Sequence, residues 1–464
     1  MSMPPLTAGW MAEAAGGRLL CGDAGCVVGD ISTDTRSLSS GDFFVALRGP
    51  RFDGHGFVGA ARAAGAIGAL VDTRYEGDRW GALVQVQDTT DGLQRLARAV
   101  RRASGARVVA ITGSAGKTTT KDATAALLAT TCRVVKNRGN LNNHIGLPLS
   151  LLQLRTSPDI AVMELGMNHA GEISRLVAIA EPDARVWTNV GDAHLGFFAS
   201  PDAIADAKAE ILEGADAGTR LVCNADDPRV MARVTGFRGR TVTFGLSPSA
   251  TVRAVDIDDR GVSGTRARVL TQAGESAIET SLIGRGNLMN VLAAIATALE
   301  FGVPLARVPG AVAGIVPADH RGVVHRLPSG VTVIDDSYNS SPSALRLALE
   351  TVAGDAHARR RVAVLGEMLE LGDQASALHE VCGRAAAAAR LDRLVTVGGA
   401  PALAMASAAV AAGLPASAVD HVASSADAAA LLDGSLQDGD LVLVKGSRGI
   451  GTELVVSRLI GGQG

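Results

Sequence analysis

The chain has 464 residues, too many for a single hydrophobic core, so two to four domains are expected. Hydrophobic residues make up 47% of the chain, charged residues make up 20%, and the formal net charge is −3, which excludes a basic field that would attract nucleic acid or membranes. No apolar run reaches the roughly 20 residues of a membrane span, and the N-terminal segment lacks a signal-peptide pattern, so a cytoplasmic protein is expected.

The first 104 residues have a mixed pattern that predicts a small α/β domain. Short apolar runs suggest strands at residues 42–49, 65–72 and 81–88. Polar segments with turn residues separate these runs, in "STDTRS" and in "RFDGHGF". We therefore assign residues 1–104 to a first domain.

From residue 105, apolar strand-like runs alternate with Ala- and Leu-rich stretches, which is typical of a parallel α/β sheet. Strands are expected at 107–112, 159–165, 184–190 and 219–225, and helices at 119–131 and 201–215. The stretch from about Ala250 to Ser281 alternates and contains turn residues, which predicts antiparallel strands. A helix is expected at 287–303. These elements define a second domain at 105–317.

The last third of the chain repeats one pattern, an apolar strand that ends in a polar loop. The strand-and-loop units lie at 331–339, 360–368, 392–399 and 440–449, with helical stretches between them. This order predicts a separate, doubly wound domain at 318–464. The fold class is therefore α/β with three domains, of which the central one carries a small antiparallel section.

The segment "VVAITGSAGKTTTK" places glycines, a lysine and threonines directly after the first strand of the central domain. Gly113 and Gly116 allow close approach of the backbone, the following helix N-terminus favours anions, and Lys117 adds a full positive charge. The hydroxyl of Thr118 is suited to bind Mg²⁺. Ile111 stands where the general P-loop has its first glycine, so the loop is short. A triphosphate-binding loop is predicted.

Two further strand ends carry residues that could bind a metal. Glu164 lies at the end of a predicted strand, in "VMEL", and His194 follows "VWTNVGDA". Glu164 could instead pair with an arginine, and His194 alone would more often be a core histidine. Together, after successive strands beside a phosphate loop, they favour ligands of Mg²⁺. The amide-rich segment 136–148 suits a polar ligand.

Taken in order, these segments resemble the motifs of the Mur ligases over essentially the whole chain. The motifs are "TGSAGKTTTK", "GNLNNHIGLPLSLL", "MELGMNHAGEI", "TNVGDAHLGFF", "IADAKAEI", "IDDSYNSSPSALRLAL", "LGEMLELG" and "VLVKGSRGI". Within the family, the resemblance is greatest to the ligases that add D-alanyl-D-alanine to UDP-N-acetylmuramoyl-tripeptide. The resemblance implies a domain for the uridine diphosphate end, a central P-loop ATPase and a Rossmann-like C-terminal domain. It also implies ligation through an acyl phosphate, with ADP and phosphate released.

The resemblance also implies residue roles. ATP would be bound by Gly113, Ser114, Ala115, Gly116, Lys117, Thr118, Thr119, Asn287, Arg321 and Asp336. Two Mg²⁺ sites would use Thr118, Glu164, His194 and a Lys208 carbamylated by CO₂, and the catalytic residues would be Lys117, Glu164, His194 and Lys208. The substrates would contact Ser32, Asp34, Thr35, Arg36, Asp53, His55, Asn142, Asn143, Tyr338, Asn339, Lys445 and Arg448.

This sequence departs from the family pattern at three places. Gly286 precedes Asn287 where the family often has histidine, and His320 takes the place of the first glycine in Gly-Arg-Gly. Arg321 itself is retained, so its phosphate role carries over. Thr35 replaces a usual serine and keeps the hydroxyl.

Several alternatives stay open at this point. The chain could be a sister ligase that adds the third amino acid, although it has no Asp-Asn-Pro-Arg motif after residue 318 and carries "GEMLELG" instead. It could also be a folylpolyglutamate-synthase-like ligase or a nucleotide-binding regulator. Lys208 could be an exposed helix lysine, and "KGSRG" a plain basic turn. The scattered cysteines favour reduced thiols, and a zinc site at Cys21 and Cys26 is disfavoured. A monomer that binds no nucleic acid is expected.

Overall fold

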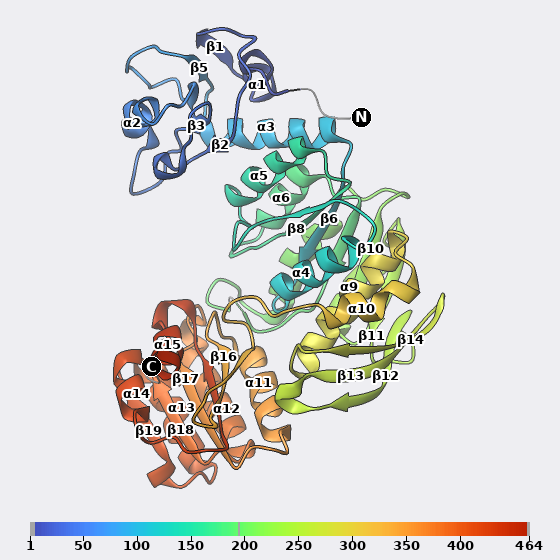
Figure 1. Cartoon of the computed structure of the whole chain (residues 1–464), viewed down its shortest axis with the longest axis vertical. Coiled ribbons are helices and arrows are strands. Elements are labelled where there is room, and N and C mark those ends of the chain that lie inside the picture. The colour runs from blue at the N-terminus through green and yellow to red at the C-terminus, as the bar shows by residue number, and fades with distance from the viewer. Residues whose placement is uncertain (1–4, 194, 462–464) are drawn as a thin grey trace. The chain divides into compact units, whose positions relative to one another are not determined.

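The computed structural model describes residues 5–193 and 195–461. Its strands form three sheets, which Figure 1 shows in order along the chain from blue to red. The chain divides into two compact units. One comprises the described part of Met1–Ile111 with Thr131–Arg185 and Glu210–Thr219, and the other comprises Thr112–Thr130, Val186–Ala209 and the described part of Arg220–Gly464. The mixed α/β architecture expected from the sequence is confirmed. The domain limits at residues 104 and 317 stay a prediction.

The N-terminal sheet has five short strands in the order β1-β5-β4-β3-β2. The strands are β1 (Arg18–Cys21), β2 (Ile31–Ser32), β3 (Phe43–Val45), β4 (Gly68–Val71) and β5 (Ala82–Gln85), and the helices are α1 (Ala8–Ala14), α2 (Val58–Ala63) and α3 (Thr89–Ser104). β2 to β5 run parallel, and β1 is antiparallel to β5. The predictions for β3, β4 and β5 are confirmed, whereas β1 and β2 were not predicted because their residues are only partly buried.

The largest sheet has nine strands in the order β14-β13-β12-β11-β10-β9-β6-β8-β7. The strands are β6 (Arg107–Thr112), β7 (Val134–Lys136), β8 (Ile160–Glu164), β9 (Ala184–Trp187), β10 (Arg220–Asn224), β11 (Arg240–Gly245), β12 (Val252–Asp259), β13 (Thr265–Thr271) and β14 (Gly274–Thr280). The antiparallel section is confirmed at β12, β13 and β14. It joins the parallel part because β12 pairs parallel with β11.

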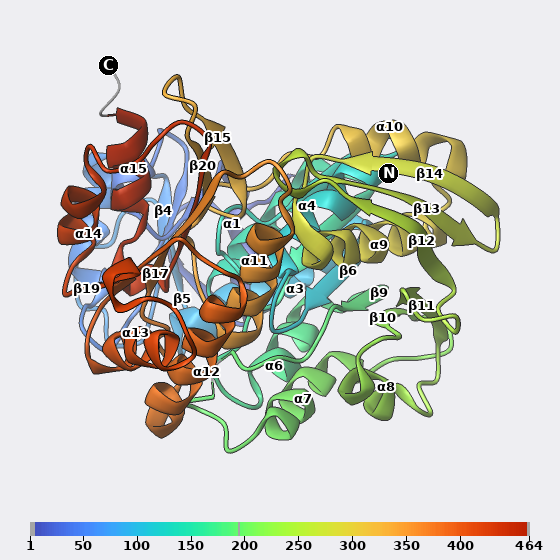
Figure 2. The ribbon, with the colours of Figure 1, turned by 90° about the horizontal axis from the view of Figure 1, so that it is seen from below.

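The helices of this region are α4 (Lys117–Leu128), α5 (Gly146–Leu151), α6 (Glu172–Ala180), α7 (Pro201–Ala209), α8 (Pro228–Val234), α9 (Gly284–Glu300) and α10 (Val308–Ala313). α9 is buried along most of its length and packs against α4 and against β10, β11 and β12 (Figure 2). It begins at Gly284, earlier than the expected residue 287, because Ile283 has the extended backbone of a helix N-cap.

The C-terminal sheet has six strands in the order β15-β16-β20-β17-β18-β19. The strands are β15 (Val323–Arg326), β16 (Thr332–Asp336), β17 (Arg360–Gly366), β18 (Arg393–Val397), β19 (Val419–Val422) and β20 (Asp440–Lys445), and the helices are α11 (Pro342–Gly354), α12 (Ala375–Ala388), α13 (Ala400–Ala411), α14 (Ser425–Leu432) and α15 (Glu453–Gly461). All strand pairs are parallel except β15 with β16.

Both faces of this C-terminal sheet are covered. Alternate valines of β16, β17, β18 and β20 form one core with residues of α14 and α15. Residues of the opposite parity, such as Ile334 and Leu443, are also buried, as parallel strands require. The predicted doubly wound arrangement is therefore confirmed. The loops after β16, β17 and β20 consequently leave the sheet at one edge, where ligands gather in such folds. None of the described helices is long and apolar enough to cross a membrane.

Candidate active site

The phosphate loop, residues 113–116, connects β6 to α4 as the sequence predicts. Gly116 is the N-cap of α4 with a left-handed φ of 80°, and a side chain there would overlap the Asn290 amide. Gly113 approaches Thr188 so closely that a Cβ atom would overlap the threonine hydroxyl. Because Gly116 offers no capping side chain, the first turn of α4 (Lys117, Thr118 and Thr119) presents its N–H groups toward an anion.

Two residues that follow β9, Thr188 and Asn189, support the loop through hydrogen bonds. The Ser114 N–H donates to the Asn189 carbonyl at 3.0 Å, and the Ala115 N–H donates to Asn189 Oδ1 at 2.9 Å. Asn189 Nδ2 and Thr188 Oγ1 both donate to the Ala115 carbonyl, at 3.0 and 2.8 Å. Sequence reasoning missed this role of Thr188 and Asn189, although both lie in the motif "TNVGDAHLGFF". These hydrogen bonds hold the loop in its observed conformation.

The lysine of the loop folds back over it. Lys117 Nζ donates to the Gly113 carbonyl at 2.8 Å, so its ammonium lies above the loop. Thr118 is nearly buried and Thr119 is half-buried. This places a positive charge and two hydroxyl-bearing residues at the N-terminus of α4, which is the chemistry that a nucleotide phosphate requires.

Lys208 lies near the end of α7 and is only 1% exposed. Burial, followed by the repulsion of the Lys117 charge, lowers the pKa of Lys208 well below its ordinary value. Among the described residues, no hydrogen bond or ion pair engages its amine. The alternative of an exposed helix lysine is therefore wrong. Lys208 therefore lies close enough to Lys117 for the charge of Lys117 to disfavour the protonated form of Lys208.

Glu164 ends β8 as predicted and is 3% exposed. The amide-rich segment serves to hold it. Asn142 Nδ2 donates to Glu164 Oε1 at 2.8 Å, and Asn137 exchanges hydrogen bonds with the main chain of Glu164 at 3.1 and 3.2 Å. Asn143 instead caps α5, because its Oδ1 accepts from Ile145 and Gly146. His194, predicted beside Glu164 as a metal ligand, lies outside the described residues.

A second cluster lies at the loop edge of the C-terminal sheet, after β16 and β20. Lys445 is 4% exposed, and its Nζ donates to Asp336 Oδ2 at 2.6 Å and to the Asn339 carbonyl at 3.0 Å. The guanidinium carbons of Arg321 and Arg448 lie 4.0 and 5.3 Å from the ring centroid of Tyr338. The predicted C-terminal residues therefore meet in one place, with Lys445 fixing the loop.

The start of the C-terminal domain approaches the beginning of α9. A Cβ atom added to Gly322 would lie 3.9 Å from Asn287 Nδ2. Asn287 Nδ2 donates to the Ile283 carbonyl at 2.9 Å, and its Oδ1 accepts from Asn290, the residue that Gly116 contacts. Asn287 therefore connects the surroundings of the phosphate loop with the segment that carries Arg321.

Sequence reasoning also missed His379, which shapes the loop "GEMLELG" after β17. Its ring is fully buried; Nε2 accepts from the Met368 N–H at 2.9 Å, and Nδ1 donates to the Ala375 carbonyl at 2.7 Å. Burial lowers the pKa of His379. The only sequence signal was a lone histidine on an amphipathic helix, which does not identify a partner.

The N-terminal residues predicted for the uridine end form two separate groups. In the first, Asp34 caps the short helix Thr35–Ser37 and pairs with Arg36 at 2.7 Å. Hydrogen bonds from Arg36 hold the pKa of Asp34 at about 2. Ser32 Oγ accepts from the Asp34 N–H at 3.0 Å. This turn is therefore ordered by its own contacts, with the Arg36 side chain exposed.

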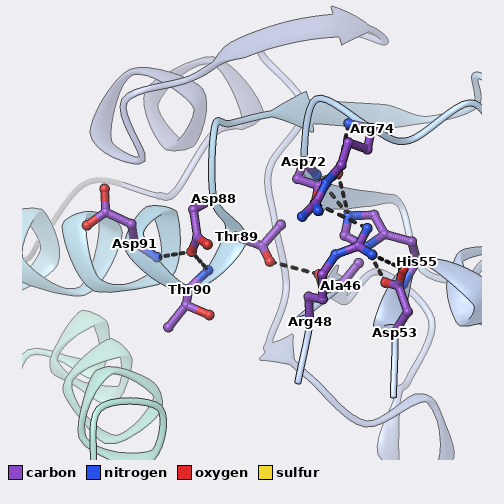
Figure 3. Close-up of polar contacts among 10 residues, drawn as sticks. All are labelled: Ala46, Arg48, Asp53, His55, Asp72, Arg74, Asp88, Thr89, Thr90 and Asp91. Carbon is purple, nitrogen blue, oxygen red and sulfur yellow. Dashed lines mark hydrogen bonds and ion pairs between the residues drawn. The ribbon is translucent and has the colours of Figure 1, made fainter. Parts of the chain in front are cut away.

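The second group centres on His55, and Figure 3 shows its members turned toward one another. His55 Nε2 accepts from the Asp72 N–H at 2.9 Å, so Nδ1 carries the proton and donates to Asp53 at 2.6 Å. Arg48 bridges Asp53 and Asp72 at 2.6 and 3.3 Å. Burial alone would raise the pKa of Asp53, but the hydrogen bonds from His55 and the Arg48 charge lower it. Both ring nitrogens of His55 are thus engaged in holding the loop.

A cavity of about 390 Å³ borders this second group. His55 lines it together with Arg62, Tyr75 and Trp80, and the Arg62 guanidinium carbon lies 5.9 Å from the Trp80 ring centroid. Asp78 lines the cavity as well, so aromatic faces and groups of both charges surround it, which suits a planar, polar ligand.

Comparisons with known proteins relate most of the chain to one family. The models described as "Mur ligase middle domain" and "Mur ligase, glutamate ligase domain" match residues 111–298 and 320–448. The UDP-N-acetylmuramoyl-tripeptide–D-alanyl-D-alanine ligase of Bacillus subtilis is 35% identical over 439 residues, which cover 94% of this chain and 93% of that protein.

Solved structures give the same relation. A crystal structure of MurF from Acinetobacter baumannii superposes with a TM-score of 0.89 at 31% identity, covering 99% of this chain and 100% of that chain. MurF ligase from Thermotoga maritima in complex with ADP superposes with a TM-score of 0.82 at 28% identity, covering 93% of this chain and 97% of that chain.

Proposed function

The chain belongs to the Mur ligase family, and we propose that it joins D-alanyl-D-alanine to UDP-N-acetylmuramoyl-tripeptide at the expense of ATP. The similarity to ligases with this named activity extends over 94% of the chain in the Bacillus subtilis relative, which supports the proposal. The observation that carries it within the structure is the ligand-ready phosphate loop with the buried Lys208 close to Lys117.

The reaction needs activation of a carboxylate, which is a poor electrophile. A carboxylate oxygen of the tripeptide attacks the γ-phosphorus of ATP, the bond to the β,γ-bridging oxygen breaks, and ADP leaves. The dipeptide amine then attacks the acyl phosphate, a tetrahedral oxyanion forms, and phosphate departs as the amide bond is completed. Such transfer relies on positioning and charge stabilisation. Lys117 and the first turn of α4 provide both at the β- and γ-phosphates.

Mg²⁺ prefers hard oxygen ligands such as hydroxyl and carboxylate groups, although the described residues bring together no group of three acidic, histidine or cysteine side chains that could hold a metal ion. Thr118 would hold one ion, and Glu164, with a carboxylate that Asn142 orients, would hold the other together with His194 and Lys208. When bound, Mg²⁺ neutralises phosphate charge. Arg321 and Asp336 would contact the nucleotide, and Tyr338, Asn339 and Arg448 the dipeptide. Lys445, whose ammonium is held by Asp336 and the Asn339 carbonyl, would fix their loop rather than bind the dipeptide. Ser32, Asp34, Thr35, Arg36, Asp53 and His55 would face the uridine diphosphate end, for which the neighbouring cavity is a suitable size.

Lys208 would act as a carbamate. Its neutral amine, favoured by the lowered pKa, attacks CO₂; a C–N bond forms, one C=O electron pair moves to oxygen, and the amine proton leaves to water. The product is an anion with two oxygen acceptors. We expect Lys208→Ala to be nearly inactive and partly rescued by a short-chain carboxylic acid. Lys208→Arg should be equally inactive, because guanidinium keeps its charge.

Carbamylation has a readout that is independent of turnover. The wild-type protein equilibrated with ¹³C-bicarbonate should give a carbamate carbon resonance that Lys208→Arg lacks. A resonance of equal intensity in Lys208→Arg, or normal turnover of that variant, would show that Lys208 is not the modified residue.

The substrate proposal is tested by ADP release with each substrate omitted in turn. Release of ADP should require both UDP-tripeptide and D-alanyl-D-alanine. We further propose that the enzyme is a monomer and acts in the cytoplasm. Faster release with diaminopimelate or L-lysine as the amine would favour the sister ligase that adds the third residue, and release with a folate substrate would favour the folylpolyglutamate-type reaction.

A further inference from the structure

His320 has a backbone conformation that a residue with a side chain seldom adopts. Its φ is 60°, in the left-handed region that glycine tolerates best. The residue directly precedes Arg321, which the proposed function assigns to the nucleotide. A strained position next to a binding residue calls for a compensating interaction.

The compensating interaction is made by the imidazole. His320 Nδ1 lies 2.7 Å from Asp335 Oδ2, at the end of β16. Asp335 is 3% exposed, and its other oxygen accepts from Ser337 Oγ at 2.5 Å and from the Ser337 N–H at 3.2 Å. The histidine therefore binds a carboxylate that is itself fixed. His325 Nε2 is 4.0 Å from the same carboxylate, beyond hydrogen-bond distance.

Main-chain hydrogen bonds flank this side-chain contact. The Tyr338 N–H donates to the His320 carbonyl at 3.0 Å, and the Gly322 N–H donates to the Asp335 carbonyl at 2.8 Å. The segment around Arg321 is thus bound on both sides to the end of β16 and the loop after it. This arrangement places the Arg321 guanidinium carbon 4.0 Å from the Tyr338 ring centroid.

We infer that His320 is a positioning residue that holds Arg321 over Tyr338 through its contact with Asp335. This inference rests on the proposed function for the statement that Arg321 meets the nucleotide. The contact of the imidazole with Asp335 holds the backbone of this segment in place, so Arg321 is oriented before ATP binds. Loss of the anchor should weaken nucleotide binding and leave the uridine end of the other substrate unaffected.

Three variants separate the effect of the His320 side chain from the effect of its backbone conformation. His320→Gly permits the same φ and removes the anchor, whereas His320→Asn tolerates the left-handed region and restores a donor toward Asp335. His325→Asn is the matched control, since it changes the neighbouring histidine of the same carboxylate.

The first readout does not depend on turnover. The chain has two tyrosines, so labelling with 3-fluorotyrosine gives two ¹⁹F resonances, and Tyr75→Phe assigns the one from Tyr338. We expect His320→Gly to shift the Tyr338 resonance and His320→Asn to restore it. His325→Asn should leave it unchanged.

The second readout is steady-state kinetics. His320→Gly should raise KM for ATP by about tenfold, a typical coupling of one oriented charge contact, with KM for UDP-tripeptide unchanged. His320→Asn should recover most of that loss. A wild-type Tyr338 resonance and ATP KM in His320→Gly would overturn the inference, as would a lower melting temperature with neither readout altered.

Arg321→Ala distinguishes a failure of the positioning role of His320 from a failure of the nucleotide-binding role of Arg321. If Arg321→Ala raises the ATP KM and His320→Gly does not, the positioning role fails and the proposed function stands. If Arg321→Ala leaves the ATP KM unchanged while His320→Gly shifts the Tyr338 resonance, the positioning role stands and the nucleotide assignment of Arg321 fails.

Discussion

Lys208 is proposed to be catalytic, and yet we expect it to lower the free energy of unfolding of the protein. Its amine is buried, and the described residues give it no hydrogen-bond or ion-pair partner. The repulsion from Lys117 adds to the burial penalty. Methionine has a similar length, carries no charge and tolerates burial. We therefore predict that Lys208→Met is inactive and yet more stable than the wild-type protein.

The magnitude follows from the proton balance. In an unfolded chain the lysine titrates near its ordinary pKa of 10.5, whereas burial lowers the pKa in the folded protein. Between the two pKa values the unfolded state binds more protons, so the stability of the wild-type protein rises with pH by about 1.4 kcal/mol per unit. A buried amine without a partner costs on the order of 3 kcal/mol near neutral pH. The advantage of Lys208→Met should therefore be on the order of 3 kcal/mol at about pH 7.5 and clearly smaller at about pH 9.5, because the stability of the wild-type protein rises with pH over this range.

Urea denaturation in bicarbonate-free buffer with a chelator measures this difference. Replacing Trp10 and Trp80 by phenylalanine leaves Trp187 of β9, which is fully buried in the same compact unit as α7, as the fluorescent reporter. Lys121→Met is the matched control. Lys121 is also buried, at 2% exposure, but lies 3.8 Å from the Asp122 carboxylate, so its replacement should destabilise the protein.

Two results would refute this reasoning. Lys208→Met could prove no more stable than the wild-type protein at neutral pH, which would mean that the amine is solvated or paired in solution. The difference could also stay constant between the two pH values, which would mean that the pKa of Lys208 is not lowered.

Three further predictions concern the phosphate loop and the proposed metal ligand. Lys117→Ala should abolish ADP release with the far-UV circular dichroism unchanged, because it removes the charge above the loop; near-normal turnover would contradict this. Glu164→Gln should raise the Mg²⁺ concentration for half-maximal rate at least tenfold, since a charged ligand of a hard cation is lost; an unchanged Mg²⁺ titration would assign Glu164 a structural role. Gly116→Ala should weaken ADP binding, measured by calorimetry, because the added methyl group overlaps Asn290 and the left-handed φ costs about 1 kcal/mol; wild-type affinity would show that the loop yields freely.

The sequence by itself determined the features that depend on neighbouring residues. The strand, short glycine loop and helix around Lys117 form where they were expected, because glycine positions and apolar runs act locally. Glu164 lies at a strand end for the same reason. The order of strands also identified the doubly wound C-terminal domain, since a parallel sheet requires buried runs separated by helices.

Only the tertiary structure decided which polar groups form hydrogen bonds with one another. Asn189, more than 70 positions from the loop that it supports, and His379, which holds Met368, show no local pattern that names a partner. Segment 136–148 is rich in amides, yet only the folded chain assigns Asn142 to Glu164 and Asn143 to a helix cap. Burial of Lys208 depends on packing around the whole of α7, and the anchor at His320 depends on a strand that begins only later in the chain. Hydrogen bonds between residues far apart in the chain depend on geometry, which periodicity and composition do not encode.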